Sequence, residues 1–305
     1  MISSNDLIKN RILIIGSNGM LGQRLTGYFS SFDKVELFCS SAETSSFIPD
    51  VSYLQVDISQ KNEVKKLIHN FYPDFIINAA AYTNVDGCEI EKELAWKINV
   101  DGVVNISKSA KAIHAHVIHM STDYVFDGFN GPYSEIDTVN PISYYGRTKL
   151  AAENVLREGD NTFAIIRTNV LYGPAKYGRP DFVKWAVNSL RENKNIRIVT
   201  DQINNPTYID DIVDAISKII EFRKTGIYNI GGAEFLSRFD FTLRIADFFS
   251  LDKNLILPIL TEDLKQPARR PLKSGLITLK AQTEFGFRPR SIMETFSLMK
   301  AELNL

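Results

Sequence analysis

Tyr145 and Lys149 are the residues whose types and spacing most directly suggest chemistry. They stand in the stretch 143–158, which has few helix breakers and is predicted to be helical. Residues four apart lie on one helix face, about one turn from each other. A positive charge at ~4 Å is worth roughly 4 kcal/mol at an effective dielectric of ~20. That energy would bring a phenol pKa from ~10 to about 7. Tyr145 is therefore a candidate general acid or base, although the same spacing also occurs on exposed, non-functional helices.

A glycine-rich turn near the N-terminus predicts a binding site for phosphate groups. Residues 11–15 are a continuous apolar run, typical of a buried parallel strand, and residues 20–29 read as a helix. Between them, Gly16, Gly19 and Gly22 let the backbone approach a pyrophosphate at the positive end of the helix. A turn without a ligand is the alternative. The flanking strand and helix favour nucleotide binding.

Alternating strands and helices predict a parallel, doubly wound sheet of the Rossmann-like α/β class. Strands are expected at 11–15, 35–39, 52–56, 75–77, 116–120 and 162–167, with helices at 60–70 and 89–112 among the connections. Ligands on such sheets bind beyond the carboxyl ends of the strands. Three segments fall at such ends: Asn78–Ala81, Ser121–Asp123 and Arg167–Asn169.

The carboxyl-terminal part of the chain predicts a smaller, mixed α/β lobe. Residues 171–180 are rich in glycine and proline and suit a crossover, whereas 264–290 has no clear period and is expected to be largely irregular. A strand at 226–230 is expected to return to the main sheet. We predict a dinucleotide-binding domain over 1–170, with a return segment at about 208–232, and a substrate-binding lobe over 171–207 and 233–305.

Composition excludes several functional classes. The formal net charge of −1 gives no electrostatic case for nucleic acid or an anionic membrane, and no apolar run reaches the ~18 residues of a membrane span. The two cysteines suit neither a disulfide framework nor a metal site. We expect a cytoplasmic protein without a metal. His114, His116 and His119 are expected to be solvated or at the core edge.

The motifs together resemble the extended short-chain dehydrogenase/reductase family, and within it the dTDP-4-dehydrorhamnose reductases. The resemblance runs from Arg11 to about Pro289. It is carried by four motifs: Gly16-x-x-Gly19-x-x-Gly22, Asn78-Ala79-Ala80, Ser121-Thr122-Asp123 and Tyr145-x-x-x-Lys149. Further similar segments are 78–86, 121–128, 145–153, 167–173 and 201–208.

The resemblance implies a reductase with Thr122, Tyr145 and Lys149 as catalytic residues. Tyr145 would donate the proton, Lys149 would lower its pKa and hold the nicotinamide ribose, and Thr122 would orient the keto group. The implied hydride donor is NADPH or NADH. The implied acceptor is a nucleotide-linked 4-keto-6-deoxy sugar, dTDP-4-dehydrorhamnose, reduced to dTDP-rhamnose.

The resemblance also implies which residues bind each ligand. Cofactor contacts are expected from Gly16, Asn18, Gly19, Met20, Leu21, Gly22, Ser40, Asp57, Ile58, Ala79, Ala80, Ala81, Asn99, Tyr145 and Lys149. Substrate contacts are expected from Thr122, Asp123, Tyr124, Asn169 and Arg270. The guanidinium fork of Arg270 suits a diphosphate, with a solvated surface position as the alternative. A homodimer is left open.

Several features keep alternatives open. Val170 stands where the reductases often carry a tryptophan, which leaves the particular sugar open. Cys39-Ser40-Ser41 offers no acid at the end of the second strand, so a 2′-phosphate is permitted and NADPH is favoured, with Arg24 as a candidate partner. The other readings are another sugar-nucleotide epimerase or reductase of the superfamily, and a non-catalytic NADP-binding subunit resembling the methionine adenosyltransferase beta subunit.

Overall fold

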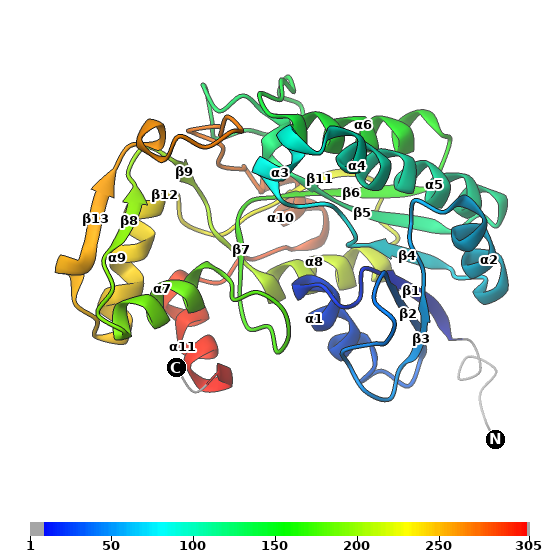
Figure 1. Cartoon of the computed structure of the whole chain (residues 1–305). Coiled ribbons are helices and arrows are strands. Elements are labelled where there is room, and N and C mark those ends of the chain that lie inside the picture. The colour runs from blue at the N-terminus through cyan, green and yellow to red at the C-terminus, as the bar shows by residue number, and fades with distance from the viewer. Residues whose placement is uncertain (1–8, 304–305) are drawn as a thin grey trace.

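The computed structural model of the chain describes residues 9–303, which are built around one parallel sheet (Figure 1). Its seven strands run in the order β11-β6-β5-β4-β1-β2-β3, and every neighbouring pair is parallel. The strands are β1 Asn10–Ile15, β2 Val35–Ser41, β3 Ser52–Gln55, β4 Phe75–Asn78, β5 His116–Thr122, β6 Phe163–Thr168 and β11 Gly226–Ile230. The strand order reverses between β1 and β4, which is where ligands bind in doubly wound sheets. The predicted fold class and the return of 226–230 to the sheet are confirmed.

Helices cover both faces of this sheet because side chains of each strand alternate between the two faces. Ile12 and Ile14 of β1 pack with α1 (Met20–Phe29), α8 (Ile209–Glu221) and α10 (Leu279–Phe285). Leu13 and Ile15 pack on the opposite face with α2 (Lys61–Phe71), α5 (Gly102–Ala112) and α6 (Tyr144–Glu158). Both faces are therefore buried, as the continuous apolar run of β1 predicts.

The connection between β4 and β5 is helical over 89–112, as expected, but it is divided into several helical segments. It consists of α3 Val85–Ile90, α4 Lys92–Trp96, a π-helical turn η2 at Lys97–Asp101, and α5. Glu91 separates α3 from α4 with a non-helical backbone, φ −104° and ψ 56°. The π-turn is a local widening of the kind often found at functional sites, and it carries Asn99.

The smaller lobe has its own apolar core, which includes Tyr172, Phe241 and Phe296. It contains α7 Phe182–Arg191, α9 Arg238–Phe249, α11 Ile292–Leu303 and the parallel pair β8 Ile196–Val199 with β13 Ile256–Ile259. Two-residue strands form two further pairs, β7 Leu171–Tyr172 with β10 Thr207–Tyr208, and β9 Ile203–Asn204 with β12 Leu236–Ser237. The remaining short helical turns are η3 Asp123–Val125, η4 Lys253–Leu255 and η5 Thr261–Leu264.

Residues 264–290 are largely irregular, as expected, apart from residues 279–285, which form α10 and pack against the main sheet. The boundaries proposed for the two domains stay a prediction. Within residues 9–303, no helix combines the length and the apolar character that a membrane span requires.

Candidate active site

A cavity of about 500 Å³ lies beyond the carboxyl ends of β4, β5 and β6, beside the start of α1. The predicted catalytic residues Thr122, Tyr145 and Lys149 all line it. A second cavity of about 260 Å³ shares Gly19 and two alanines that follow β4, so the two adjoin. Most of the predicted cofactor residues line one or both cavities: Gly16, Gly19, Met20, Leu21, Gly22, Asp57, Ile58, Ala79, Ala80 and Ala81.

The start of α6 is fixed tightly, which sets the positions of Tyr145 and Lys149. Ser143 caps the helix, its hydroxyl accepting from the backbone N–H of Gly146 at 3.2 Å. A Cβ at Gly146 would lie 2.2 Å from the carbonyl oxygen of Tyr124, so only glycine permits this approach. The helix therefore packs directly on the segment that follows β5.

Lys149 is buried and directed toward β5. Its Nζ donates to the carbonyl oxygen of Met120 at 2.6 Å and lies 3.3 Å from Nε2 of His119. Burial lowers the pKa of Lys149 to about 8, against a raising effect of Glu153. An amine with this pKa exchanges protons close to neutral pH.

The surroundings of the Tyr145 phenol act on its pKa. Burial raises the pKa of Tyr145 above its ordinary value, and the neighbouring charge of Asp123 raises it further. The amine of Lys149 contacts Met120 and His119, and its predicted lowering of the Tyr145 pKa stays a prediction. Tyr145 thus holds its proton at neutral pH, as a proton donor must.

Thr122 belongs to a buried hydrogen-bond chain at the end of β5. Its hydroxyl donates to Oδ1 of Asp123 at 3.0 Å, and Oδ2 of Asp123 accepts from Ser274 at 2.5 Å. Burial raises the pKa of Asp123 to about 6. Asp123 does not line the 500 Å³ cavity, nor does Tyr124, whose ring packs edge-on against Tyr145 with centroids 5.8 Å apart. Their predicted contacts with a sugar stay a prediction.

The glycine turn fits a diphosphate. Gly16 has φ 85°, and a Cβ there would lie 2.6 Å from the backbone nitrogen of Ala80. A Cβ at Gly22 would lie 2.1 Å from the carbonyl oxygen of Gly16, so α1 packs against the turn without side chains between them. The backbone is thus exposed to the cavities at the positive end of α1, which suits an anionic group.

Three other predicted cofactor residues, Asn18, Ser40 and Asn99, line neither cavity and act as supports. Asn18 holds the loop after β2, accepting from the N–H of Phe47 at 2.9 Å. Asn99 accepts from the N–H of Tyr82 at 2.7 Å and donates to Thr148 at 3.0 Å. The carbonyl of Ser40 accepts from the N–H groups of Gly16 and Ser17.

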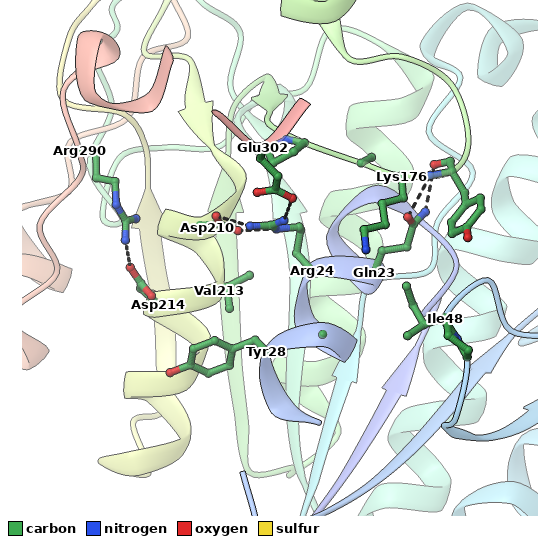
Figure 2. Close-up of a pocket in the computed structure, with 15 residues that line it drawn as sticks. Gln23, Arg24, Tyr28, Ile48, Lys176, Asp210, Val213, Asp214, Arg290 and Glu302 are labelled. Atoms are coloured by element: carbon green, nitrogen blue, oxygen red, sulfur yellow. Dashed lines mark hydrogen bonds and ion pairs between the residues drawn. The ribbon is translucent and has the colours of Figure 1, made fainter. Parts of the chain in front are cut away.

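An acid that the sequence search overlooked lines the smaller cavity. Glu43 accepts from the side-chain amide of Asn18 at 3.2 Å, and no lysine or arginine is among the residues lining that cavity. The expectation of no acid near this end of β2 is therefore wrong, because the loop beyond Ser41 folds back over the turn. Arg24 is bound to Asp210, at 2.6 and 2.7 Å, and to Glu302 (Figure 2).

The predicted diphosphate ligand Arg270 does not line the catalytic cavity. Its two terminal nitrogens donate to Asp86 at 2.6 and 2.7 Å. The side chain also borders a separate cavity of 410 Å³, together with Gly128 and Phe129. A role of Arg270 at the substrate stays a prediction.

A further cavity, of about 670 Å³, lies outside the catalytic site (Figure 2). It lies between α1, α8 and the loop around Tyr177, and contains none of the predicted catalytic residues. Gln23 connects this loop to the glycine turn. Its amide donates to the carbonyl oxygens of Asn18 at 2.7 Å and Tyr177 at 3.0 Å, and accepts from the N–H of Tyr177 at 3.2 Å.

His119 and Ser274 are the main residues that sequence reasoning missed. His119 is fully buried between Asn78 and Lys149, so the expected solvated or core-edge position is wrong for it. Its place in a central parallel strand was a usable signal, because both faces of such strands are buried. Across residues 9–303, no group of three or more His, Cys, Asp or Glu side chains is placed to hold a metal ion.

Comparison with known proteins agrees with this geometry. Residues 10–304 match the family described as RmlD substrate binding domain. A dTDP-4-dehydrorhamnose reductase from Aggregatibacter actinomycetemcomitans is 34% identical over 92% of this chain and 94% of its own. The methionine adenosyltransferase 2 subunit beta of Bos taurus is 30% identical over 90% of this chain and 82% of its own.

A solved structure extends the similarity to three dimensions. The dTDP-4-dehydrorhamnose reductase of Bacillus anthracis str. Ames, in complex with NADP, superposes with a TM-score of 0.87 at 31% identity, covering 97% of this chain and 100% of that one. The family match spans nearly the whole length, from the first strand of the sheet to the last helix. The chain belongs to the RmlD substrate-binding domain family.

Proposed function

We propose that the chain is a nicotinamide-dependent reductase that converts dTDP-4-dehydrorhamnose, a nucleotide-linked 4-keto-6-deoxy sugar, to dTDP-rhamnose. The observation that carries this proposal is that Thr122, Tyr145 and Lys149 line one cavity together with the start of α1. The relatives named as reductases, and the NADP in one of their structures, support it.

The two adjoining cavities fit a nicotinamide dinucleotide. Gly16 to Gly22 would hold the diphosphate through backbone N–H groups, Asp57 and Ile58 would face the adenosine end, and Lys149 would hold the nicotinamide ribose. A bound NADPH or NADH supplies the hydride.

The chain's own residues handle the proton. Tyr145 keeps its proton because burial raises its pKa, and it would give that proton to the keto oxygen as negative charge develops there. Thr122 would donate a hydrogen bond to the same oxygen, which requires its hydroxyl to turn from Asp123 toward the cavity. Oδ1 of Asn169, buried without a partner at the cavity, is available to a hydroxyl of the sugar.

Oxidation of NADPH and of NADH in the presence of dTDP-4-dehydrorhamnose tests the proposal. The matched variants are Tyr145→Phe and Tyr144→Phe, the latter a neighbouring residue of α6 that does not line the cavity. Loss of the proton donor should slow the reaction roughly 10²- to 10⁴-fold, whereas Tyr144→Phe should keep the wild-type rate. A folded, cofactor-binding Tyr145→Phe protein that reduces the sugar at the wild-type rate would exclude the assignment.

The second candidate function is that of a non-catalytic subunit, favoured by the similarity to the methionine adenosyltransferase 2 subunit beta. The fold does not separate the two, because function resides in the site. Wild-type protein that binds cofactor tightly, turns over no ketosugar and co-purifies with a methionine adenosyltransferase would favour the subunit.

A further inference from the structure

We propose that His119 is a positioning residue for Lys149, presenting a ring N–H to the lysine nitrogen and thereby favouring the uncharged amine. This inference deepens the proposed function, on which it rests for the role of Lys149 in catalysis. It rests structurally on a continuous set of hydrogen bonds that joins the ends of β4 and β5 to α6.

The orientation of the His119 ring follows from a backbone donor. The N–H of Ala80 donates to Oδ1 of Asn78 at 3.2 Å. Because a backbone N–H can only donate, this bond fixes the side-chain oxygen of Asn78 and turns its NH₂ group toward His119. That group lies 3.1 Å from Nδ1 of His119, which must then accept. In a neutral imidazole with Nδ1 accepting, the proton is on Nε2.

The His119 ring is neutral. Its side chain has no exposed surface, and burial lowers its pKa well below the ordinary value, with the nearby Lys149 lowering it further. Nε2–H therefore points at Nζ of Lys149 across 3.3 Å. A protonated Lys149 would direct an N–H group at the N–H of His119, and these two donors would repel each other. An uncharged amine satisfies both contacts, accepting from Nε2 and donating to the carbonyl oxygen of Met120 at 2.6 Å.

The charged groups around Lys149 oppose this effect only in part. Glu153, one turn further along α6, raises the pKa of Lys149, but both its oxygens are engaged, by Arg167 at 2.9 and 2.7 Å and by Ser121 at 2.6 Å. Asp123, on η3, is held by Thr122 and Ser274. The groups from β4 and η2, Asn78 and Asn99, are uncharged amides.

The uncharged amine has a place in the reaction. When Tyr145 protonates the keto oxygen, its O–H bond breaks and a new O–H bond forms on the sugar. The ammonium of Lys149 can then return a proton to the phenolate, and the amine left behind is the form that His119 stabilises. Solvent then returns a proton to the amine of Lys149. A lysine with an ordinary pKa would release this proton less readily.

The direct test is a pH titration of Lys149 by NMR on the full chain labelled with ¹³C at the lysine Cε positions. Loss of one resonance in Lys149→Met assigns the signal. The wild-type midpoint is expected at about 8. His119→Phe, which fills the same space without a donor, should raise it by about one unit, and His119→Gln, which restores an N–H, should return it toward wild type.

Two further variants make the test decisive. His116→Phe changes another buried histidine of β5, whose ring packs against Phe75, and should leave the midpoint unchanged. Asn78→Asp places an acceptor opposite Nδ1, moves the ring proton there and turns a lone pair toward Lys149, so the midpoint should rise. The rise should be smaller in Asn78→Asp with His119→Phe, where only the new charge acts. The alkaline limb of kcat/KM for the ketosugar should move with each midpoint.

The proposal fails if wild-type Lys149 titrates near the ordinary ~10.4, or if its midpoint is the same in wild type, His119→Phe and Asn78→Asp. The proposed function fails separately. If the midpoints shift as expected but the wild-type chain reduces no ketosugar, His119 positions the lysine in a protein with another activity.

Discussion

The carboxylate of Glu43 bears directly on cofactor choice. Burial alone would raise its pKa, but hydrogen bonds from Ser41 and Asn18 outweigh it and hold the pKa below the ordinary value. Glu43 is therefore charged at neutral pH. It lines a cavity that contains a second carboxylate, Asp57, and no basic side chain. A carboxylate near the ribose accepts from a 2′-hydroxyl and repels a 2′-phosphate.

We predict that Glu43→Gln shifts the cofactor preference toward NADPH. The ratio of kcat/KM for NADPH to that for NADH should rise roughly fivefold, the factor given by about 1 kcal/mol, because the exposed charge is screened by solvent. Steady-state kinetics with both cofactors measure this ratio. Asp50→Asn is the control, since it removes a carboxylate from the same loop outside the cavity. An unchanged ratio in Glu43→Gln would place the ribose elsewhere.

The relative positions of site residues could be predicted from the sequence where the residues lie on one helix or strand. Tyr145 and Lys149 lie on one helix, so their spacing predicted a shared helix face, and both line one cavity. The environment of Lys149 was not predictable, because Asn78 and His119 come from different strands and meet it only through the strand order.

The loop at 174–177 is held by side chains on both sides of the glycine turn. Gln23, in the first turns of α1, binds the backbone of Tyr177. The Tyr177 ring also contacts Phe47 with centroids 5.6 Å apart, and Asn18 binds the N–H of Phe47. The loops after β2 and β7 are thus joined beside the start of α1.

We predict that Gln23→Glu weakens cofactor binding. A charged carboxylate cannot donate to the carbonyl oxygens of Asn18 and Tyr177, and opposing buried acceptors cost roughly 1–3 kcal/mol. The dissociation constant of the cofactor, measured by fluorescence titration, should rise about tenfold, as ~1.4 kcal/mol gives. Gln282→Glu on α10 makes the same chemical change far along the chain and should have no effect. Equal affinities in the two variants would show that the loop does not support the cofactor site.

Helices and strands could be predicted from the sequence where their pattern of apolar residues extends over enough positions. The strands of the main sheet and α6 lie within a few residues of their predicted positions. α10 has only seven residues and is too short to be stable alone, so its helical form depends on packing by Ala281 and Phe285 beneath the sheet.

At the scale of the whole molecule, one buried ion pair joins the catalytic helix to the sheet. Glu153 of α6 and Arg167 of β6 bind each other with two hydrogen bonds, and their side chains are 0% and 2% exposed. Ser121 donates to Glu153 next to Thr122, so the same pair also holds the end of β5. Nη1 of Arg167 has no hydrogen-bond partner and the guanidinium lies over the Phe126 ring at 5.2 Å.

We predict that Glu153→Gln lowers the free energy of unfolding by about 3–5 kcal/mol, because it leaves the charge of Arg167 buried without a counter-charge. Urea unfolding followed by circular dichroism measures the loss. Asp160→Asn removes the partner of Lys111 in an exposed pair, whose side chains are 91% and 54% exposed, and should cost at most about 1 kcal/mol.

The double variant Glu153→Leu with Arg167→Met separates stability from function. Replacing both charges with apolar groups of similar size often restores stability. It also removes the charge that raises the pKa of Lys149, so the Lys149 midpoint should fall below that of the wild type. If Glu153→Gln has the same urea midpoint of unfolding as the wild type, the ion pair does not hold the helix on the sheet. If the double variant is stable but its lysine titrates as in wild type, Glu153 does not influence Lys149.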